Sequence, residues 1–373
     1  MKNLKLRLVS LLIAVLFASA ALAACSPTAA TPPAASSVAP ASSAPEASSA
    51  SVAPSDSSVP ASSAPEAAST ANRTTINLGY YQGNCELHFY AAEKLGLFDK
   101  YGLDINWIVV NDSNAATSLA AGKIDATDGI LQGWVKPVEQ GLDVRFTLGT
   151  QQGCMSTVTL ADAPYKTLAD LKGKTIGVLG VIGGGPYNYL ARTILHETDL
   201  DPQKDFQYIA YADPASLNNA LDSGKVDAIT GADALNFAGV SSGAYKWLTL
   251  MATDDYLKEE TCCLLALNPK FLEEHKDAAT AFTKAVYEAS QYVQDPEHKN
   301  EILQYAFDKQ YIINGTLEAN EAIAKEYEWD PGYDIAVSSF SNSFTDYQKA
   351  GLIDQNIDVQ KIIDKAFVDL GVG

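Results

Sequence analysis

Polar and aromatic side chains follow the first strand expected in this chain, which spans residues 75–81. The loop after this strand carries Tyr81, Gln82 and Asn84, which offer a ring face and hydrogen-bonding groups but no positive charge. In open α/β sheets, small molecules bind beside the carboxyl ends of the strands. The sequence therefore predicts that this loop forms one wall of a ligand-binding cleft.

Later strand ends carry side chains of the same kinds. The further candidates for ligand contact are Ser113, Asp128, Gln132, Trp134, Gln151, Gly184, Gly185, Tyr187, Asp233 and Asn236. The rings could stack on a flat ligand, and backbone N–H groups after the glycine run could hold an anion. Each residue also has a structural explanation, because rings pack in cores, aspartates cap turns and glycines allow tight turns.

The proposed cleft loops contain no lysine or arginine. A buried anion needs positive charge or many hydrogen-bond donors, whereas carboxylates and tyrosine rings suit a cation. The loops therefore favour a neutral or cationic nitrogenous ligand. An anion held by backbone N–H groups alone remains the alternative. No Ser/His pair or paired-carboxylate pattern supports catalysis, so we expect a binding protein and not an enzyme.

Length and charge narrow the class of protein further. A chain of 373 residues with 47% hydrophobic residues is expected to form two lobes with buried cores. The formal charge of −19 excludes a basic face for phosphate binding, so we expect no nucleic-acid partner.

Five cysteines are spread along the chain, at positions 25, 85, 154, 262 and 263. None of them forms a CxxC pair, so we expect neither a zinc site nor any other metal site, and no cofactor. Cys85, Cys154, Cys262 and Cys263 could form disulfides or remain small buried apolar residues. We expect no disulfide, because spacing alone does not establish pairing.

The amino terminus has the features of an export signal. Lys2, Lys5 and Arg7 precede an apolar run at 8–18 that is too short to span a membrane comfortably, and small residues lead to Cys25. The sequence Leu22-Ala23-Ala24-Cys25 resembles the lipobox of bacterial lipoproteins, which implies cleavage of residues 1–24 and lipid on Cys25. Residues 25–71 are rich in Ala, Ser and Pro and predict a disordered tether.

Strands and helices alternate from residue 75 to residue 268, and helices are expected to dominate afterwards. The segments 118–130 and 220–232 share a Gly-Lys-x-Asp-Ala core between a helix end and a strand, which suggests two similar lobes. We expect one lobe at 72–160, the second at 161–259, and a return to the first lobe at 260–373. The strand at 261–268, which contains Cys262 and Cys263, is expected to cross the hinge.

Five motifs occur in an order that resembles a known family. They are GYYQGN, AAEKLGLFDKYGLDI, SLAAGKIDA, KTLADLKGKTIGV and LDSGKVDAI. They resemble the solute-binding proteins of nitrate, sulfonate, taurine and thiamine-precursor ABC importers. The resemblance implies an α/β fold of the periplasmic-binding-protein type II class, with two lobes, two hinge crossovers and a helical C-terminal region. It also implies an ABC permease and ATPase as partners, a monomer, and anchoring by lipid on the extracytoplasmic face of a bacterial membrane.

The same resemblance leaves three ligand or function alternatives. A pyrimidine-type vitamin precursor suits the cation-free loops, and an alkanesulfonate, taurine or nitrate is the alternative within the importer class. Fungal thiamine-pyrimidine synthases are related enzymes. Resemblance to them would imply a cysteine-rich iron motif and a histidine and a lysine in the active site, but the cleft loops contain no lysine. A ligand-sensing lipoprotein without an importer is the third alternative.

Overall fold

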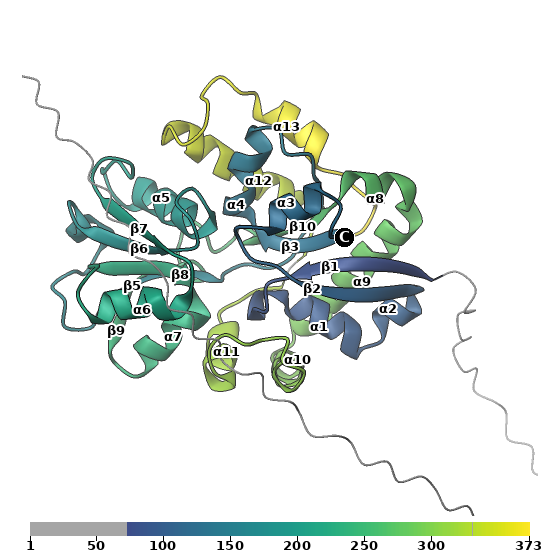
Figure 1. The fold of residues 1–373 in the computed structure, drawn as a ribbon, viewed down its shortest axis with the longest axis horizontal. Helices are drawn as coiled ribbons and strands as arrows, with labels where there is room; N and C mark the ends of the chain where they lie inside the picture. Colours follow the sequence, from purple (N-terminus) through teal and green to yellow (C-terminus); the bar gives the residue numbers. More distant parts are fainter. Residues whose placement is uncertain (1–72, 330) are drawn as a thin grey trace, which may run out of the picture. The chain divides into compact units, whose positions relative to one another are not determined.

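The computed structural model describes residues 73–329 and 331–373 (Figure 1). All of them belong to one compact unit. The expected signal peptide, Cys25 and the tether lie outside the described residues. None of the helices in the described segments is both long and apolar enough to cross a membrane.

Two five-stranded sheets form the two lobes (Figure 1). The first contains, in spatial order, β2 (Leu103–Val109), β1 (Thr74–Tyr80), β3 (Ala126–Ile130), β10 (Cys263–Leu267) and β4 (Arg145–Gly149). The second contains β7 (Gln207–Tyr211), β6 (Thr175–Leu179), β8 (Ala228–Ala232), β5 (Met155–Leu160) and β9 (Tyr245–Leu250). In each sheet the first three strands are parallel, and the fourth is antiparallel to both neighbours. The two sheets therefore share one topology, in agreement with the expected α/β fold.

The Gly-Lys-x-Asp-Ala repeat has the same structural role in both sheets. A carboxylate oxygen of Asp125 accepts a hydrogen bond of 2.9 Å from the backbone N–H of Asn77 in β1. Asp227 accepts one of 3.0 Å from the backbone N–H of Thr175 in β6. Each aspartate thus ties the segment before the third strand to the neighbouring parallel strand. This shared contact explains why the two motifs look alike.

The chain changes sheet earlier than the sequence suggests. Because β5 belongs to the second sheet, the first crossover lies between Gly149 and Met155 and not after residue 160. β9, which the sequence analysis did not identify, lies at the edge of the second sheet, and β10 returns the chain to the first. β3 also continues to Ile130, so Asp128 lies inside the strand and not after its end.

Helices cover both faces of the two sheets. In the first lobe and the C-terminal region they are α1 (Leu87–Lys94), α2 (Leu97–Lys100), α3 (Ala115–Ala120), α4 (Leu131–Glu139), α8 (Pro269–Glu274), α9 (Lys276–Val293), α10 (Pro296–Asp308), α11 (Leu317–Ala324), α12 (Tyr333–Lys349) and α13 (Val359–Ala366). In the second lobe they are α5 (Gly185–Glu197), α6 (Pro214–Asp222) and α7 (Asp233–Ser241). Short 3-10 helices span Asn84–Glu86 and Leu168–Leu171.

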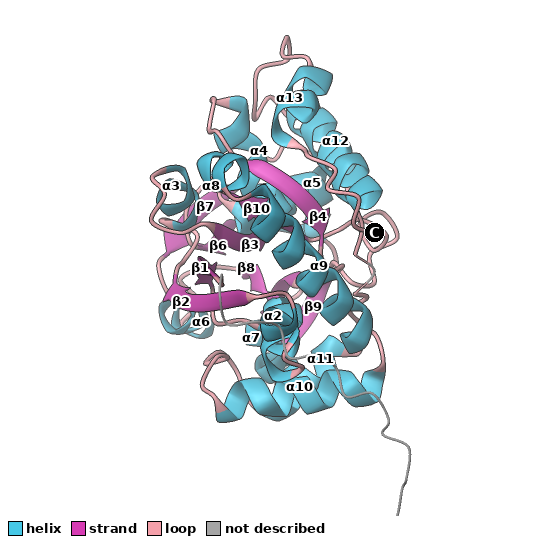
Figure 2. Ribbon diagram, turned by 90° about the vertical axis from the view of Figure 1, so that its right-hand side faces the viewer, coloured by secondary structure: helices cyan, strands magenta, loops and turns pink. Residues whose placement is uncertain are grey.

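The apolar core of the first lobe lies on both faces of its sheet. On one face, α1 and α9 pack together around Phe89 and Phe282. On the other, α4 and α12 surround Phe146 of β4. The C-terminal segment accordingly divides, with α10 and α11 at one end of the molecule and α12 and α13 at the other (Figure 2). From this segment, Asn314 and Asn320 on the α10–α11 side line the cavity described next.

Candidate functional site

A cavity of about 380 Å³ lies where the two lobes meet. The first lobe contributes the loops after β1 and β2 and the end of β3, including Tyr81, Asp112 and Asp128. The second lobe contributes the segments after β6 and β8, including Val181 and Leu235. Strand-end loops thus form both walls, as the topology requires for a ligand site in an α/β sheet.

Four of the residues expected to contact a ligand line this cavity. They are Tyr81, Asn84, Ser113 and Asp128. Gln82 lies in the same loop with a positive φ of 59°, and its carbonyl accepts a hydrogen bond from the backbone N–H of Ile313. Its side chain is not part of the cavity lining.

Five other candidates are buried and do not line the cavity. Trp134 is buried against Phe146, with ring centroids 5.6 Å apart, and Tyr187 packs edge-on against Tyr208. The backbone carbonyl of Gln132 accepts a hydrogen bond of 2.8 Å from the Asn188 side chain, whereas the side-chain amide of Gln132 is buried without a hydrogen-bond partner in the described part of the chain. The side chain of Asn236 donates one of 2.8 Å to Ser156. The Asp233 carboxylate accepts hydrogen bonds from the Tyr327 hydroxyl and the Ala234 N–H.

The glycine run before α5 lies against the other lobe. A Cβ atom on Gly185 would meet Ile130 Cγ2 at 3.1 Å, and one on Gly133 would meet the backbone N of Gly185 at 3.4 Å. Gly184 is the N-cap residue of α5. Neither Gly184 nor Gly185 lines the cavity. The glycines let α5 and α4 of opposite lobes approach closely, which is a structural role beside the ligand site.

Buried carboxyl groups give the cavity its electrostatic character. Burial raises the pKa of Glu86 to about 7, although Glu86 accepts a hydrogen bond of 2.9 Å from the Tyr81 N–H. Burial and the neighbouring Glu86 raise the pKa of Asp128 well above its usual range. His88 Nε2 lies 3.3 Å from Asp128 Oδ2 without the geometry of a hydrogen bond. Burial lowers the pKa of His88 to about 3, so this histidine is neutral and offers Asp128 no charge.

Sequence reasoning missed Glu86 and Asp112, which also line the cavity. Glu86 lies at the start of a helical stretch, where an acidic residue is an ordinary feature. Asp112 stands among residues that are typical of helix caps. The available signal was their position directly after the ends of β1 and β2, the same signal that identified Tyr81 and Ser113.

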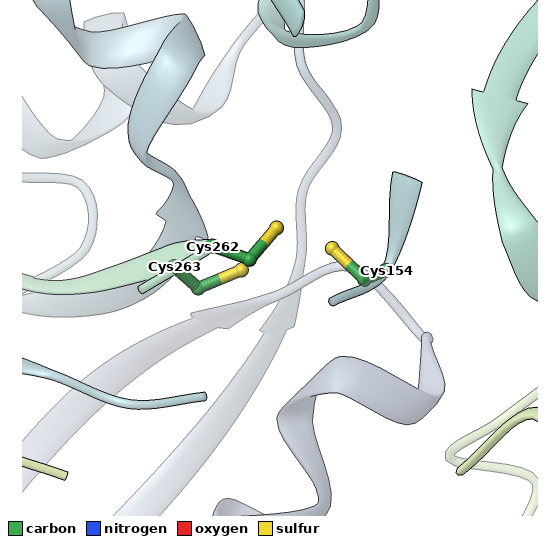
Figure 3. Close-up of side chains that lie close together, drawn as sticks. All are labelled: Cys154, Cys262 and Cys263. Carbon is green, nitrogen blue, oxygen red and sulfur yellow. The ribbon is translucent and has the colours of Figure 1, made fainter. Parts of the chain in front are cut away.

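Sequence reasoning also missed a cluster of cysteines. The sulfur atoms of Cys154, Cys262 and Cys263 all lie within 4.8 Å of one another (Figure 3). Gln151, a ligand candidate that does not line the cavity, donates a hydrogen bond of 3.3 Å from Nε2 to Cys263 Sγ. Cys85, Cys154 and Cys263 line the cavity. The sequence predicts no metal site because the cysteines are dispersed along the chain. The fold brings three of them together, so dispersal no longer argues against a metal site.

The thiols perturb one another. Burial opposes the thiolate form of Cys154, but the hydrogen-bonding groups of Cys262, Cys263, Cys85 and Gln151 outweigh it and bring the pKa of Cys154 well below its usual value. The interaction with Cys154 raises the pKa of Cys85 and of Cys263. Cys85 lines the same cavity as Cys154 and Cys263, although its sulfur is not among the three closest.

Comparison with known proteins identifies the family. The family described as "NMT1/THI5 like" matches residues 86–299 of this chain. The chain belongs to this family. The matched segment includes the cavity residues Glu86, Asp112 and Asp128. It also includes Cys154, Cys262 and Cys263, whereas Cys85 lies one residue before the segment.

Individual relatives agree with the family. YtlA of Bacillus subtilis (strain 168) is 25% identical over 307 residues, which cover 75% of this chain and 84% of YtlA. A protein of Haemophilus influenzae named for thiamine biosynthesis is 31% identical over 164 residues, covering 43% of this chain and 50% of that protein. The crystal structure of the periplasmic nitrate-binding protein NrtA from Synechocystis PCC 6803 matches with a TM-score of 0.68 at 16% identity, covering 79% of this chain and 86% of NrtA.

These matches establish the family and the fold. The two lobes have the periplasmic-binding-protein fold that the sequence predicted. The chain is thus a member of the NMT1/THI5-like family with the fold of these binding proteins.

Proposed function

We propose that this protein captures a small cationic or neutral nitrogenous solute outside the cytoplasm and delivers it to the permease of an ABC importer. The observation that carries the proposal is the charge of the cavity. Glu86, Asp112 and Asp128 line it, whereas none of its lining residues in the described part of the chain is lysine, arginine or histidine. Carboxylates in this site would attract a cation and repel an anion.

A pyrimidine-type vitamin precursor is a ligand of suitable chemistry. It combines a flat ring, which Tyr81 could stack on, with nitrogen groups that could donate to Asp128 and Asn84. The similarity to a protein named for thiamine biosynthesis supports this choice. The similarity to a nitrate-binding protein supports the alternative, an anion such as nitrate or an alkanesulfonate held by backbone N–H groups.

A ligand panel distinguishes these possibilities. We expect aminopyrimidine compounds to raise the melting temperature of the purified full-length protein and to bind in calorimetry with one site per chain. Nitrate, taurine and alkanesulfonates should have no effect at the same concentrations. Stabilisation by an anion alone would contradict the proposed ligand class and would favour the alternative.

Asp128 provides a sharper test of the charge argument. Asp128→Asn keeps the shape of the side chain but removes its ability to ionise, and because burial opposes the ionised form of Asp128, the melting temperature should not fall. Affinity for a cationic ligand should fall at least about tenfold, equivalent to about 1.4 kcal/mol, because the ionised partner is lost. Asp162→Asn, at an exposed position outside the cavity, is the matched control. Equal affinities for both variants would place the cationic group elsewhere.

Membrane anchoring is part of the same proposal. The lipobox-like sequence before Cys25 supports lipid on that residue and a tether that holds the two lobes away from the membrane. We expect the mass of the membrane-extracted protein to equal that of the chain from Cys25 onward plus a diacylglyceryl group and an acyl chain. Cys25→Ser should abolish this addition and release the protein from the membrane. An unmodified Cys25 in the extracted protein would disprove the anchor.

A further inference from the structure

Four thiols from three distant segments lie at the cavity or beside it. Cys85 follows β1, Cys154 lies in the first crossover, and Cys262 and Cys263 lie where the chain returns to the first sheet. Cys154, Cys262 and Cys263 are no more than 3% exposed. Their sulfur atoms lie within 4.8 Å of one another, and Figure 3 shows the sulfur of Cys154 pointing toward the other two.

Ordinary apolar packing does not account for this arrangement. Cys154 has a φ of 86°, a conformation that residues other than glycine rarely adopt, and such strain persists where the surroundings require it. That conformation accompanies a sulfur directed at the thiols of the opposite segment. Gln151 donates a hydrogen bond to Cys263 Sγ, as groups around a metal-bound sulfur commonly do. A core position would need none of these features.

The number of sulfur atoms favours metal coordination over a disulfide. A disulfide uses two sulfurs and leaves the others unexplained, and the described cysteines are free. Thiolate sulfur is the preferred donor for zinc and for copper(I). Zn–S bonds of about 2.3 Å in a tetrahedral site place the sulfurs about 3.8 Å apart. Small side-chain rotations would bring the three central sulfurs from their present separations to that value.

We propose that Cys154, Cys262 and Cys263, with Cys85 as the fourth donor, form a binding site for one thiophilic metal cation such as Zn(II) at the wall of the ligand cavity. Each coordinating thiol gives its proton to solvent as its metal–sulfur bond forms, so binding involves no oxidation or reduction. Neighbouring carboxyl groups make the surroundings favourable to a cation. The site does not depend on the identity of the organic solute.

Metal uptake by the reduced full-length protein tests the proposal. We expect one equivalent of Zn(II) or Cd(II) to remain bound after dialysis, and the Cd(II) form to show sulfur-to-metal charge-transfer absorption in the ultraviolet. Mg(II) and Ca(II) should not bind, because hard cations prefer oxygen donors. Absence of the Cd(II) absorption, or binding of Mg(II) as tight as that of Zn(II), would overturn the proposal.

Cysteine variants locate the metal. Cys262→Ser should weaken Zn(II) binding at least about a hundredfold, more than loss of a group that only supports a ligand. Cys25→Ser is the matched control and should bind as the parent does. Because Cys262 does not line the cavity, its replacement should leave affinity for the organic solute unchanged. Failure of the metal site and failure of the proposed solute are therefore distinguishable.

Thiol protection provides a test that needs no variant. In the native protein the buried thiols react only through local opening, so Zn(II) should slow the alkylation of Cys85, Cys154, Cys262 and Cys263, whereas Mg(II) should not. Equal alkylation with and without Zn(II) would contradict the site. If the thiols of the purified protein are joined as disulfides, and the reduced protein takes up no Zn(II), the cysteines form a redox-active disulfide pair and the metal site is disproved.

Discussion

Replacing Arg192 with methionine should lower the free energy of unfolding by about 3–5 kcal/mol, because it removes one partner from a buried ion network. The guanidinium group is fully buried in α5, with Nη1 2.7 Å from Glu260 and Nη2 3.0 Å from Asp346. Nη2 also donates a hydrogen bond of 2.6 Å to the Tyr256 hydroxyl. Methionine would fill similar space but, among the described residues, leave Glu260 without a cation and Asp346 with only His196 at 3.1 Å and Lys349 at 3.6 Å.

This network joins the two lobes. Arg192 belongs to a second-lobe helix, while Asp346 lies in α12, which packs on β4 of the first lobe. Glu260 precedes β10, in the crossover that returns to the first sheet. The substitution should therefore loosen the hinge as well as destabilise the fold.

Denaturant unfolding of the full-length protein measures the effect. Lys204→Met is the matched control, because Lys204 forms an exposed ion pair with Asp201 and such a pair contributes at most about 1 kcal/mol. If the Arg192 variant loses no more than this control, water reaches the carboxylates and the network is not truly buried.

The loss should also depend on pH. Burial opposes ionisation of Asp346, but the hydrogen bond from Tyr256 and the charge of Arg192 outweigh it, so its pKa lies below the ordinary value of 3.8. A lowered folded-state pKa contributes stability above the unfolded value, and this contribution disappears as the pH falls through the folded value. The difference between parent and variant should accordingly be largest near neutral pH and shrink toward pH 4 and below. A constant difference across this range would contradict the role of Asp346.

Gly185→Val should weaken ligand binding by preventing close approach of the lobes. The new side chain would meet Ile130 across the interface, where even a Cβ atom is at 3.1 Å. Overpacking of this kind costs about 1–3 kcal/mol. If that cost falls on the closed state, the affinity for the panel ligand drops roughly 5- to 150-fold. Gly185 has no left-handed φ, so the isolated lobe should tolerate valine.

Ile130→Ala is the matching second change. Removing the Ile130 side chain makes room for the valine introduced by Gly185→Val, so the double variant should regain affinity relative to what the two single effects would give together. Ile130 also lines the cavity, and the double-mutant cycle corrects for its own effect on binding. Simple additivity would mean that the glycine run serves the ligand directly and not the contact between lobes.

Local sequence patterns determined most of the architecture. Alternating strand and helix signals predicted the α/β fold, and the repeated Gly-Lys-x-Asp-Ala core predicted two similar lobes. These predictions succeeded because each depends on contacts near in sequence or shared by both lobes, such as Asp125 with Asn77 and Asp227 with Thr175. The same reasoning placed Tyr81, Asn84 and Ser113 at the cavity, because strand ends mark that edge of a sheet, whereas Asp128 lines the cavity from within β3.

Only the tertiary structure decided which strand-end residues turn inward and which distant residues meet. Trp134 and Asn236 are at expected strand ends, but core packing and an internal hydrogen bond engage them instead of the cavity. Cys85, Cys154 and Cys262 are separated by 69 and 108 residues along the chain, from their numbers in the sequence. Sequence spacing therefore argued against a metal site, yet the two crossovers pass beside the end of β1 and bring the thiols together. Hydrophobic periodicity in the sequence specifies which faces of strands and helices are buried. The meeting of three distant segments depends on the order in which the chain connects the strands of the two sheets.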